Sequence, residues 1–250
     1  MGPVKSAQRT LAILELMERM RRPARVCEIA KLLGYPQSSA SVLINSLQDL
    51  GYLKFNRETH EYAPSIRVAL VGGYLRFDNL HAHQVLDLIC DVRDRTGLTT
   101  ILSTRNGVHV QYIYALAEPG RRMLGLRAGS MRPLTRASPG VMLLTACTDD
   151  EISRVARYLY EHVPNRDDRE RFENVLAAVR EAREVGYACV LRRLKVTAGS
   201  VAVLLPFRDS FGKQLALSVS GRAEKIDESK LELVEAMRSA IGKYHQPVPG

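Results

Sequence analysis

Apolar residues recur at helical spacing on both sides of a glycine near the start of the chain. Val26, Ile29 and Leu33 lie three or four positions apart, which predicts a short helix with one apolar face. Gly34 should end this helix, because glycine readily adopts the left-handed conformation common at helix C-termini. A second amphipathic helix is predicted from Pro36 to Leu50, with polar residues along its other face.

A predicted hairpin follows this pair of helices. Two short segments with aromatic residues, Tyr52–Phe55 and Glu61–Ala63, flank a polar turn at 56–60. Two helices, a tight turn and a hairpin, in this order, predict a winged helix-turn-helix whose second helix enters the major groove of DNA. An ordinary helical pair packed in a core is the alternative, which the polar outer face and the hairpin disfavour.

From Leu80 onward the pattern mixes helices with β-branched strands. We expect an α+β domain with a mainly antiparallel sheet and helices outside it. Several local signals define its elements: Asn106-Gly107 as a two-residue hairpin turn, a loop over Gly129–Arg136, a helix opened by Ser138-Pro139, a capping box at Thr148–Glu151, and a final helix capped by Asp227. The predicted strands in this half are 98–104, 108–115, 123–127, 187–194, 200–207 and 214–220.

The predicted domain organisation has three parts. Residues 1–64 form the DNA-binding domain, which includes a first helix from Lys5 or Ser6 to Met20. Residues 65–79 form a linker that contains a connecting helix from Ile66 to Phe77, and Gly72-Gly73 is its weak point because glycine disfavours helix. Residues 80–250 form the third part, an effector-binding and oligomerisation domain.

Charge supports a polyanionic partner. The net charge is +9, and residues 1–77 hold eleven Lys and Arg against six Asp and Glu. The N-terminal third therefore carries more positive charge per residue than the rest, which favours double-stranded DNA.

Other classes of protein lack support in the sequence. The four cysteines are far apart and without a CxxC, so neither a disulfide framework nor a metal site is expected, and we expect no cofactor. No apolar run reaches the roughly 20 residues of a membrane span, and no secretory signal is recognisable. No nucleophile elbow, phosphate-binding loop or zinc-protease motif occurs, which argues against an enzyme. A cytoplasmic, nucleoid-associated location follows as an expectation.

Several short stretches together resemble the IclR family of bacterial transcriptional regulators. They run from Val4 to Leu14, then Glu28-Ile29-Ala30, Leu33-Gly34, Leu50–Leu53, Gly129-Ser130 with Pro133-Leu134, Gly186-Tyr187-Ala188 and Leu217–Gly221. The resemblance implies a winged helix-turn-helix followed by a GAF-like effector domain. It also implies a homodimer or tetramer on a roughly palindromic operator, and a small-molecule effector, often an organic or aromatic acid.

The predicted DNA-reading helix departs from that family because it has no arginine or lysine from Gln37 to Gly51. Base reading would then fall to neutral side chains: Gln37 and Asn45 can pair with adenine, and Val42 can contact a thymine methyl group. We therefore expect less reading of guanine than is usual. The predicted base-reading residues are Gln37, Ser38, Ser39, Ser41, Val42 and Asn45, and the predicted phosphate contacts are Lys5, Arg9, Arg25, Lys54 and Arg57.

The resemblance also places an effector pocket in the C-terminal half. Its predicted residues are Ser138, Pro139, Gly140, Val190, Leu191, Ala202, Ser218 and Ser220. Ser138 as N-cap would leave the N–H groups of Gly140 and Val141 free for a carboxylate, while Ser218 and Ser220 would share one face of a strand. The alternative is that these serines only cap a helix or meet solvent.

A second function remains open beside the regulator. Without a base-reading arginine, the helix-turn-helix could be a protein-interaction module, or the chain a ligand sensor without sequence-specific DNA binding.

Overall fold

The structure, a computed structural model, divides into two compact units, residues 1–74 and 75–250. It describes residues 4–65, 67–68, 71, 76–77, 80–117, 126, 128–162, 172–192, 197–209 and 211–244. The two units are described separately below. No helix in these ranges is long and apolar enough to cross a membrane.

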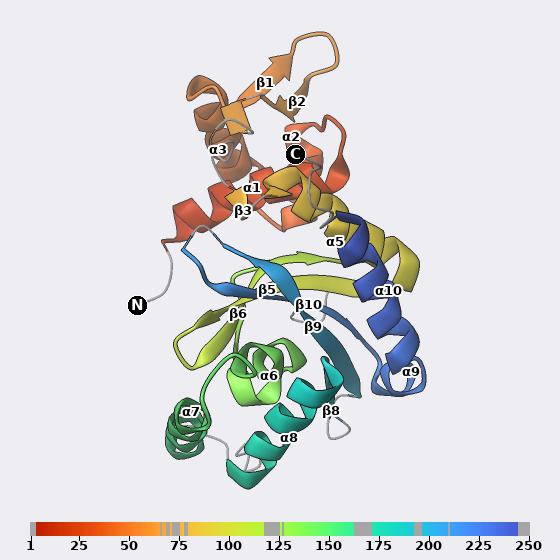
Figure 1. The fold of residues 1–250 in the computed structure, drawn as a ribbon. Helices are drawn as coiled ribbons and strands as arrows, with labels where there is room; N and C mark the ends of the chain where they lie inside the picture. Colours follow the sequence, from red (N-terminus) through yellow and green to blue (C-terminus); the bar gives the residue numbers. More distant parts are fainter. Residues whose placement is uncertain are drawn as a thin grey trace. The chain divides into compact units, whose positions relative to one another are not determined.

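The described part of the N-terminal unit includes the helices α1 to α3 and a hairpin (Figure 1). Its elements are α1 (Lys5–Met20), α2 (Val26–Leu33), α3 (Gln37–Asp49), β1 (Leu53–Asn56) and β2 (Glu61–Pro64). Gly34 ends α2 with φ of 69°, as its position predicts. One buried side of each helix packs on the hairpin through a core that includes Ile13, Ile29, Ile44 and Tyr62. The predicted winged helix-turn-helix is confirmed.

The hairpin is joined to the chain between α1 and α2. Ala24 and Tyr62 exchange two backbone hydrogen bonds, of 3.0 and 2.8 Å, which adds a third backbone segment beside β2. The Asn56 side chain accepts from the backbone N–H of Glu58 at 2.8 Å and so orders the loop. The wing is therefore held at its base and at its turn.

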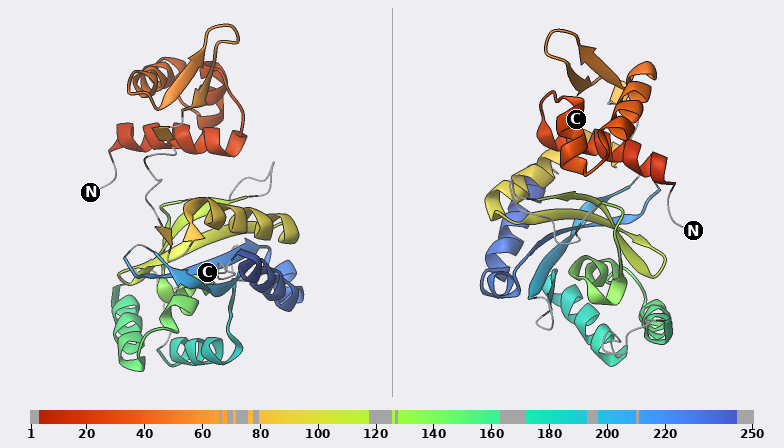
Figure 2. Two further views of the ribbon diagram at one scale, coloured as in Figure 1. Left: turned by 45° about the horizontal axis from the view of Figure 1, so that its top comes forward. Right: turned by 180° about the vertical axis from the view of Figure 1, so that it is seen from behind.

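The C-terminal unit is built on a six-stranded sheet in the order β7-β6-β5-β10-β9-β8, with every neighbouring pair antiparallel. Figure 2 shows helices on both of its faces. The strands are β5 (Thr99–Asn106), β6 (His109–Leu116), β7 (Met131–Pro133), β8 (Ala188–Arg192), β9 (Ala198–Arg208) and β10 (Gln214–Gly221). The helices are α5 (Ala82–Thr96), α6 (Ser138–Leu144), α7 (Asp149–His162), α8 (Phe172–Val185), α9 (Ala223–Glu228) and α10 (Lys230–Tyr244).

Two separate cores cover the two faces of this sheet. Helices α5, α9 and α10 pack on one face against large side chains such as Val203 and Leu217. Helices α6 and α8 pack on the other face, with α7 against α8, and small residues such as Ala202 and Ala216 point from the same strands toward α6. The expected α+β domain with helices outside an antiparallel sheet is confirmed.

Three local predictions in this unit are wrong. Asn106 pairs with His109, so the hairpin loop is Gly107-Val108, with the glycine at φ of 61° in the first loop position. Residues 131–136 are not a loop: they form the edge strand β7 and a single 3₁₀ turn, η1 (Leu134–Arg136). Asp227 lies within α9 and does not cap the final helix, because a break at Ser229 separates α9 from α10.

The predicted capping box is confirmed. The Glu151 carboxylate accepts from the backbone N–H of Thr148 at 3.0 Å, and the Thr148 hydroxyl accepts from the N–H of Glu151 at 3.3 Å. The backbone hydrogen bond is the main reason that the pKa of Glu151 is lowered.

The predicted linker falls mostly outside the described residues, and so do Gly72-Gly73. Arg67, Val68 and Val71 are helical as predicted. Arg76–Phe77 is a short strand, β3, paired with β4 (Leu80–His81), so the predicted helix does not continue to Phe77. The predicted strand at 123–127 also lies outside the described residues, apart from Leu126. The predicted domain boundaries stay a prediction.

Gly140 provides a test of how closely α6 packs. A Cβ at this position would lie 2.2 Å from the carbonyl oxygen of Leu134, whereas one at Gly242 in α10 would meet no atom within 4 Å. We predict that Gly140→Ala lowers the free energy of unfolding by about 1–3 kcal/mol or more, measured by urea denaturation. Gly242→Ala, the control, should leave it unchanged or raise it by up to about 1 kcal/mol. Equal effects would contradict this packing.

Candidate DNA interface and effector site

The exposed face of α3 is polar but uncharged along most of its length. Ser38, Val42 and Asn45 are exposed at successive turns, opposite the buried Ala40, Ile44 and Leu47. Ser39 and Ser41 are half-buried at its margins, and Gln37 is exposed at its N-terminal end. This face therefore presents hydroxyl, amide and methyl groups to a partner, and it has no positive charge of its own.

Positive side chains flank this face at two ends. The Arg9 guanidinium lies 5.2 Å from the ring centroid of Tyr35, in the turn before α3. On the other side, the Arg25 Nε donates to the carbonyl of Thr59 in the wing at 3.1 Å. Arg57 is exposed in the wing loop, Lys54 is exposed on β1, and Lys5 is exposed at the start of α1.

Not every basic residue of this unit is available to a phosphate. Arg22 forms an ion pair with Glu28, and its hydrogen bond is the main reason that the pKa of this carboxyl is lowered. Arg21 is paired with Glu18 at 3.4 Å. Arg9, Arg25 and Arg57 thus differ from Arg21 and Arg22, which already have carboxylate partners.

The wing also contacts α3 directly. The Tyr62 hydroxyl donates to Oδ1 of Asn45 at 3.2 Å. Tyr35 and Tyr62 are residues of this surface that sequence reasoning missed. Aromatic residues in a turn and a strand signal packing, and their contacts with Arg9 and Asn45 depend on the fold.

The predicted effector residues gather on the face of the sheet that α6 covers, with one exception. Ala202 pairs with Ser218 across β9 and β10, and Val190 lies on the same face of β8. Ser220 donates to the carbonyl of Gly199 at 3.0 Å. Leu191 packs in the core of α5, α9 and α10 instead, because neighbouring residues of a strand point to opposite faces.

The expected role of Ser138 is wrong. Ala137 is the N-cap residue of α6, and Ser138 is the first helical residue, fully buried with its hydroxyl 2.7 Å from that of Ser200. The N–H of Val141 donates to the carbonyl of Ala137, so it is not free for a carboxylate as predicted. Pro139 and Gly140 are buried in the same helix.

Several serine hydroxyl groups lie on the face of the sheet that α6 covers. Ser200 lies opposite Ser220 in the β9–β10 register and contacts Ser138. The Ser218 hydroxyl is buried, at 1% exposure, and has no hydrogen-bond partner within the described part of the chain. Ser103 is in the same state on β5. Ser200 and Ser103 were missed, because strand pairing alone brings them beside Ser220 and Ala216.

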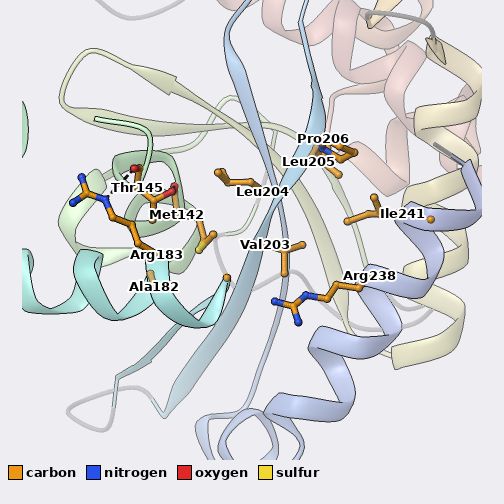
Figure 3. Close-up of a pocket in the computed structure, with 12 residues that line it drawn as sticks. Met142, Thr145, Ala182, Arg183, Val203, Leu204, Leu205, Pro206, Arg238 and Ile241 are labelled. Atoms are coloured by element: carbon orange, nitrogen blue, oxygen red, sulfur yellow. Dashed lines mark hydrogen bonds between the residues drawn. The ribbon is translucent and has the colours of Figure 1, made fainter. Parts of the chain in front are cut away.

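A groove of about 560 Å³ lies elsewhere, along the edge of β9 beyond the end of β8 (Figure 3). Met142 and Thr145 of α6, residues 203–206 of β9, and Ile241 of α10 contribute to its walls. It contains none of the predicted effector residues.

The two arginines of this groove already have partners in the protein. Arg183 donates to the carbonyls of Thr145 and Cys147 and to Asp149, whose pKa is lowered chiefly by this hydrogen bond. Arg238 donates to the carbonyl of Val185 at 3.0 Å. These contacts link helices and leave the groove mainly apolar.

The cysteines and acidic residues offer no metal centre within the described ranges. All four cysteines are free thiols. Burial raises the pKa of Cys147 although Arg105 donates to its sulfur at 3.0 Å, so this thiol is largely protonated.

Comparison with known proteins matches both units of the chain to domains of one family. Residues 6–57 match the IclR helix-turn-helix domain, and residues 80–243 match the bacterial transcriptional regulator IclR C-terminal domain. The HTH-type transcriptional regulator XynR of Escherichia coli (strain K12) is 24% identical over 230 residues, which cover 91% of this chain and 90% of XynR.

Solved structures of relatives share the fold. The effector domain of a putative IclR transcriptional regulator from Acinetobacter sp. ADP1 has a TM-score of 0.61 at 23% identity, covering 67% of this chain and 96% of that one. An IclR homologue from Microbacterium hydrocarbonoxydans, in complex with 4-hydroxybenzoate, has a TM-score of 0.54 at 18% identity, covering 96% and 98%.

The distribution of free and paired arginines predicts different salt dependences of DNA binding. Arg57→Gln should reduce the slope of log binding constant against log salt concentration by about one unit, because one phosphate contact is lost. Arg22→Gln, the control, should change the slope little because Glu28 already holds that guanidinium. Fluorescence anisotropy over a salt series measures both. Equal slopes for Arg57→Gln and the unaltered chain would show that Arg57 does not contact a phosphate.

Proposed function

The chain belongs to the IclR family of bacterial transcriptional regulators, and we propose that it binds a roughly palindromic operator as a homodimer or tetramer under the control of a small organic acid. The family is one of DNA-binding regulators with an effector domain, and it is not a family of enzymes. Such a regulator acts in the cytoplasm, associated with the nucleoid when it is bound.

The observation that carries the DNA-binding proposal is the pairing of an uncharged reading face with charged flanks. Exposed groups of Gln37, Ser38 and Val42 on α3 support a role in contacting base edges. Arg9 beside the turn before α3, with Arg25 and Arg57 at the wing, supports a role in contacting phosphates. Phosphate contacts then supply affinity and register, and base contacts from α3 supply sequence preference.

The effector proposal rests on the hydroxyl groups between α6 and the sheet. The Ser218 hydroxyl is buried and has no partner in the part of the chain that the structure describes. Such a group carries a desolvation penalty of about 1–3 kcal/mol that a ligand can relieve. Ser138, Ser200 and Ser220 extend the polar set, and Ala202 and Val190 give it apolar walls. Serine hydroxyls can donate to a carboxylate, and a structural relative was solved with 4-hydroxybenzoate.

The DNA-binding proposal is tested with the DNA adjoining the chain's own gene. Anisotropy titrations at two salt concentrations should show tighter binding to one segment of it than to a scrambled duplex of equal length. Equal binding to both duplexes at both salt concentrations would reject sequence-specific regulation and favour a protein-interaction module.

The effector proposal makes a prediction for Ser218. Aromatic acids, with 4-hydroxybenzoate as the first probe, should raise the melting temperature; at 100 times the dissociation constant the stabilisation is about 2.7 kcal/mol. Ser218→Ala should abolish most of this shift yet leave the ligand-free stability unchanged or higher, because it removes an unpaired buried hydroxyl.

The matched control is Ser239→Ala, which removes an exposed hydroxyl from α10 on the other side of the sheet. It should keep the full ligand-induced shift. A Ser218→Ala chain that responds to the ligand as the unaltered chain does would place the effector elsewhere.

A further inference from the structure

We propose that Asn45 reads the operator only as a hydrogen-bond donor, favouring guanine over adenine, and that Tyr62 of the wing imposes this role. The inference rests on the proposed DNA-binding function and names one determinant of its specificity. It concerns a contact between a strand of the wing and the helix that faces DNA.

The Tyr62 hydroxyl is well placed to fix the Asn45 side chain. It donates to Oδ1 of Asn45 at 3.2 Å, while the Tyr62 residue as a whole is only 7% exposed. Its backbone is held by the two hydrogen bonds to Ala24, and its ring packs 4.7 Å from the ring of Phe55. The tyrosine therefore cannot move away without breaking the base of the wing.

This hydrogen bond decides which end of the carboxamide faces outward. An asparagine carboxamide has an accepting oxygen at one end and a donating NH₂ group at the other. Since Oδ1 is directed to the wing, Nδ2 is the end left for a partner. Asn45 itself is exposed on α3, on the same face as Ser38 and Val42. It thus presents a neutral donor at the C-terminal end of the reading face.

A donor alone distinguishes the two purines. Both have an acceptor at N7, but guanine has a second acceptor, O6, where adenine has an amino group that donates. Asparagine recognises adenine by accepting from N6 with its oxygen while its nitrogen donates to N7. The oxygen of Asn45 keeps a second lone pair, but the Tyr62 hydroxyl holds it toward the wing and so away from the base edge that Nδ2 faces. The expectation from sequence that Asn45 pairs with adenine is therefore replaced, while Gln37 keeps both ends of its amide exposed.

The test is a selection of bound duplexes from a randomised library, followed by anisotropy on single-position variants. The unaltered chain should prefer guanine to adenine about tenfold at one position per half-site, and Asn45→Ala should abolish that preference. Tyr62→Phe keeps the ring and frees Oδ1, so it should shift the preference at this position toward adenine by about fivefold or more.

Two further variants keep the result interpretable. Tyr52→Phe removes another tyrosine hydroxyl from the same unit, one that makes no described hydrogen bond to Asn45, and it should select as the unaltered chain does. If Tyr62→Phe fails to fold, Asn45→Asp serves in its place, because a carboxylate cannot donate and should reverse the preference for guanine.

The outcomes separate this inference from the function on which it rests. If the selection with the unaltered chain enriches no sequence, both sequence-specific DNA binding and the role of Asn45 are overturned. An enriched operator in which the Asn45-dependent position is adenine, or in which Tyr62→Phe changes nothing, would overturn the role of Asn45 and leave the regulator intact.

Discussion

The central constraint in the C-terminal unit is that one sheet is buried on both faces, with side chains of unequal size on the two sides. Strands β9 and β10 direct Val203 and Leu217 toward α5 and α10, and they direct Ala202 and Ala216 toward α6. Successive side chains of a strand alternate between faces, so this division follows from the order of large and small residues. Small residues allow α6 to approach closely, and Gly140 lies directly against the backbone of Leu134.

The small residues on the face that α6 covers include the hydroxyl groups of the candidate effector site. Alternating small residues on β9 and β10 include Ser200, Ser218 and Ser220, and α6 contributes Ser138. Some of these hydroxyls bond to one another or to a carbonyl, whereas that of Ser218 has no partner among the described residues. A buried group that gains a partner only when a ligand binds links stability to ligand binding, which is the basis of regulation by a small molecule.

The N-terminal unit divides its chemistry in another way. Positive charge is supplied by residues outside α3, and the reading face from Gln37 to Asn45 offers only neutral groups. Packing of the wing against α3 orients at least one of those groups, because Tyr62 is shared between the core and Asn45. The hairpin is thus both a carrier of charge, through Arg57, and a support for the helix.

The sequence by itself determined the elements whose signals lie within a few residues. Helical spacing located α2 and α3, Gly34 marked the end of α2, and the Thr148–Glu151 capping box marked the start of α7. The family resemblance, which predicted both kinds of domain, is confirmed by the domain matches. The same local reasoning was wrong at Asn106. Asn106-Gly107 was the predicted hairpin turn, but Asn106 pairs with His109, so the turn lies one residue later. Tertiary structure alone decided the partners of polar side chains: Tyr62 is 17 residues from Asn45, and Ser138 is 62 residues from Ser200. Such contacts depend on strand register and helix packing across the whole unit, and no periodicity within a short window encodes them.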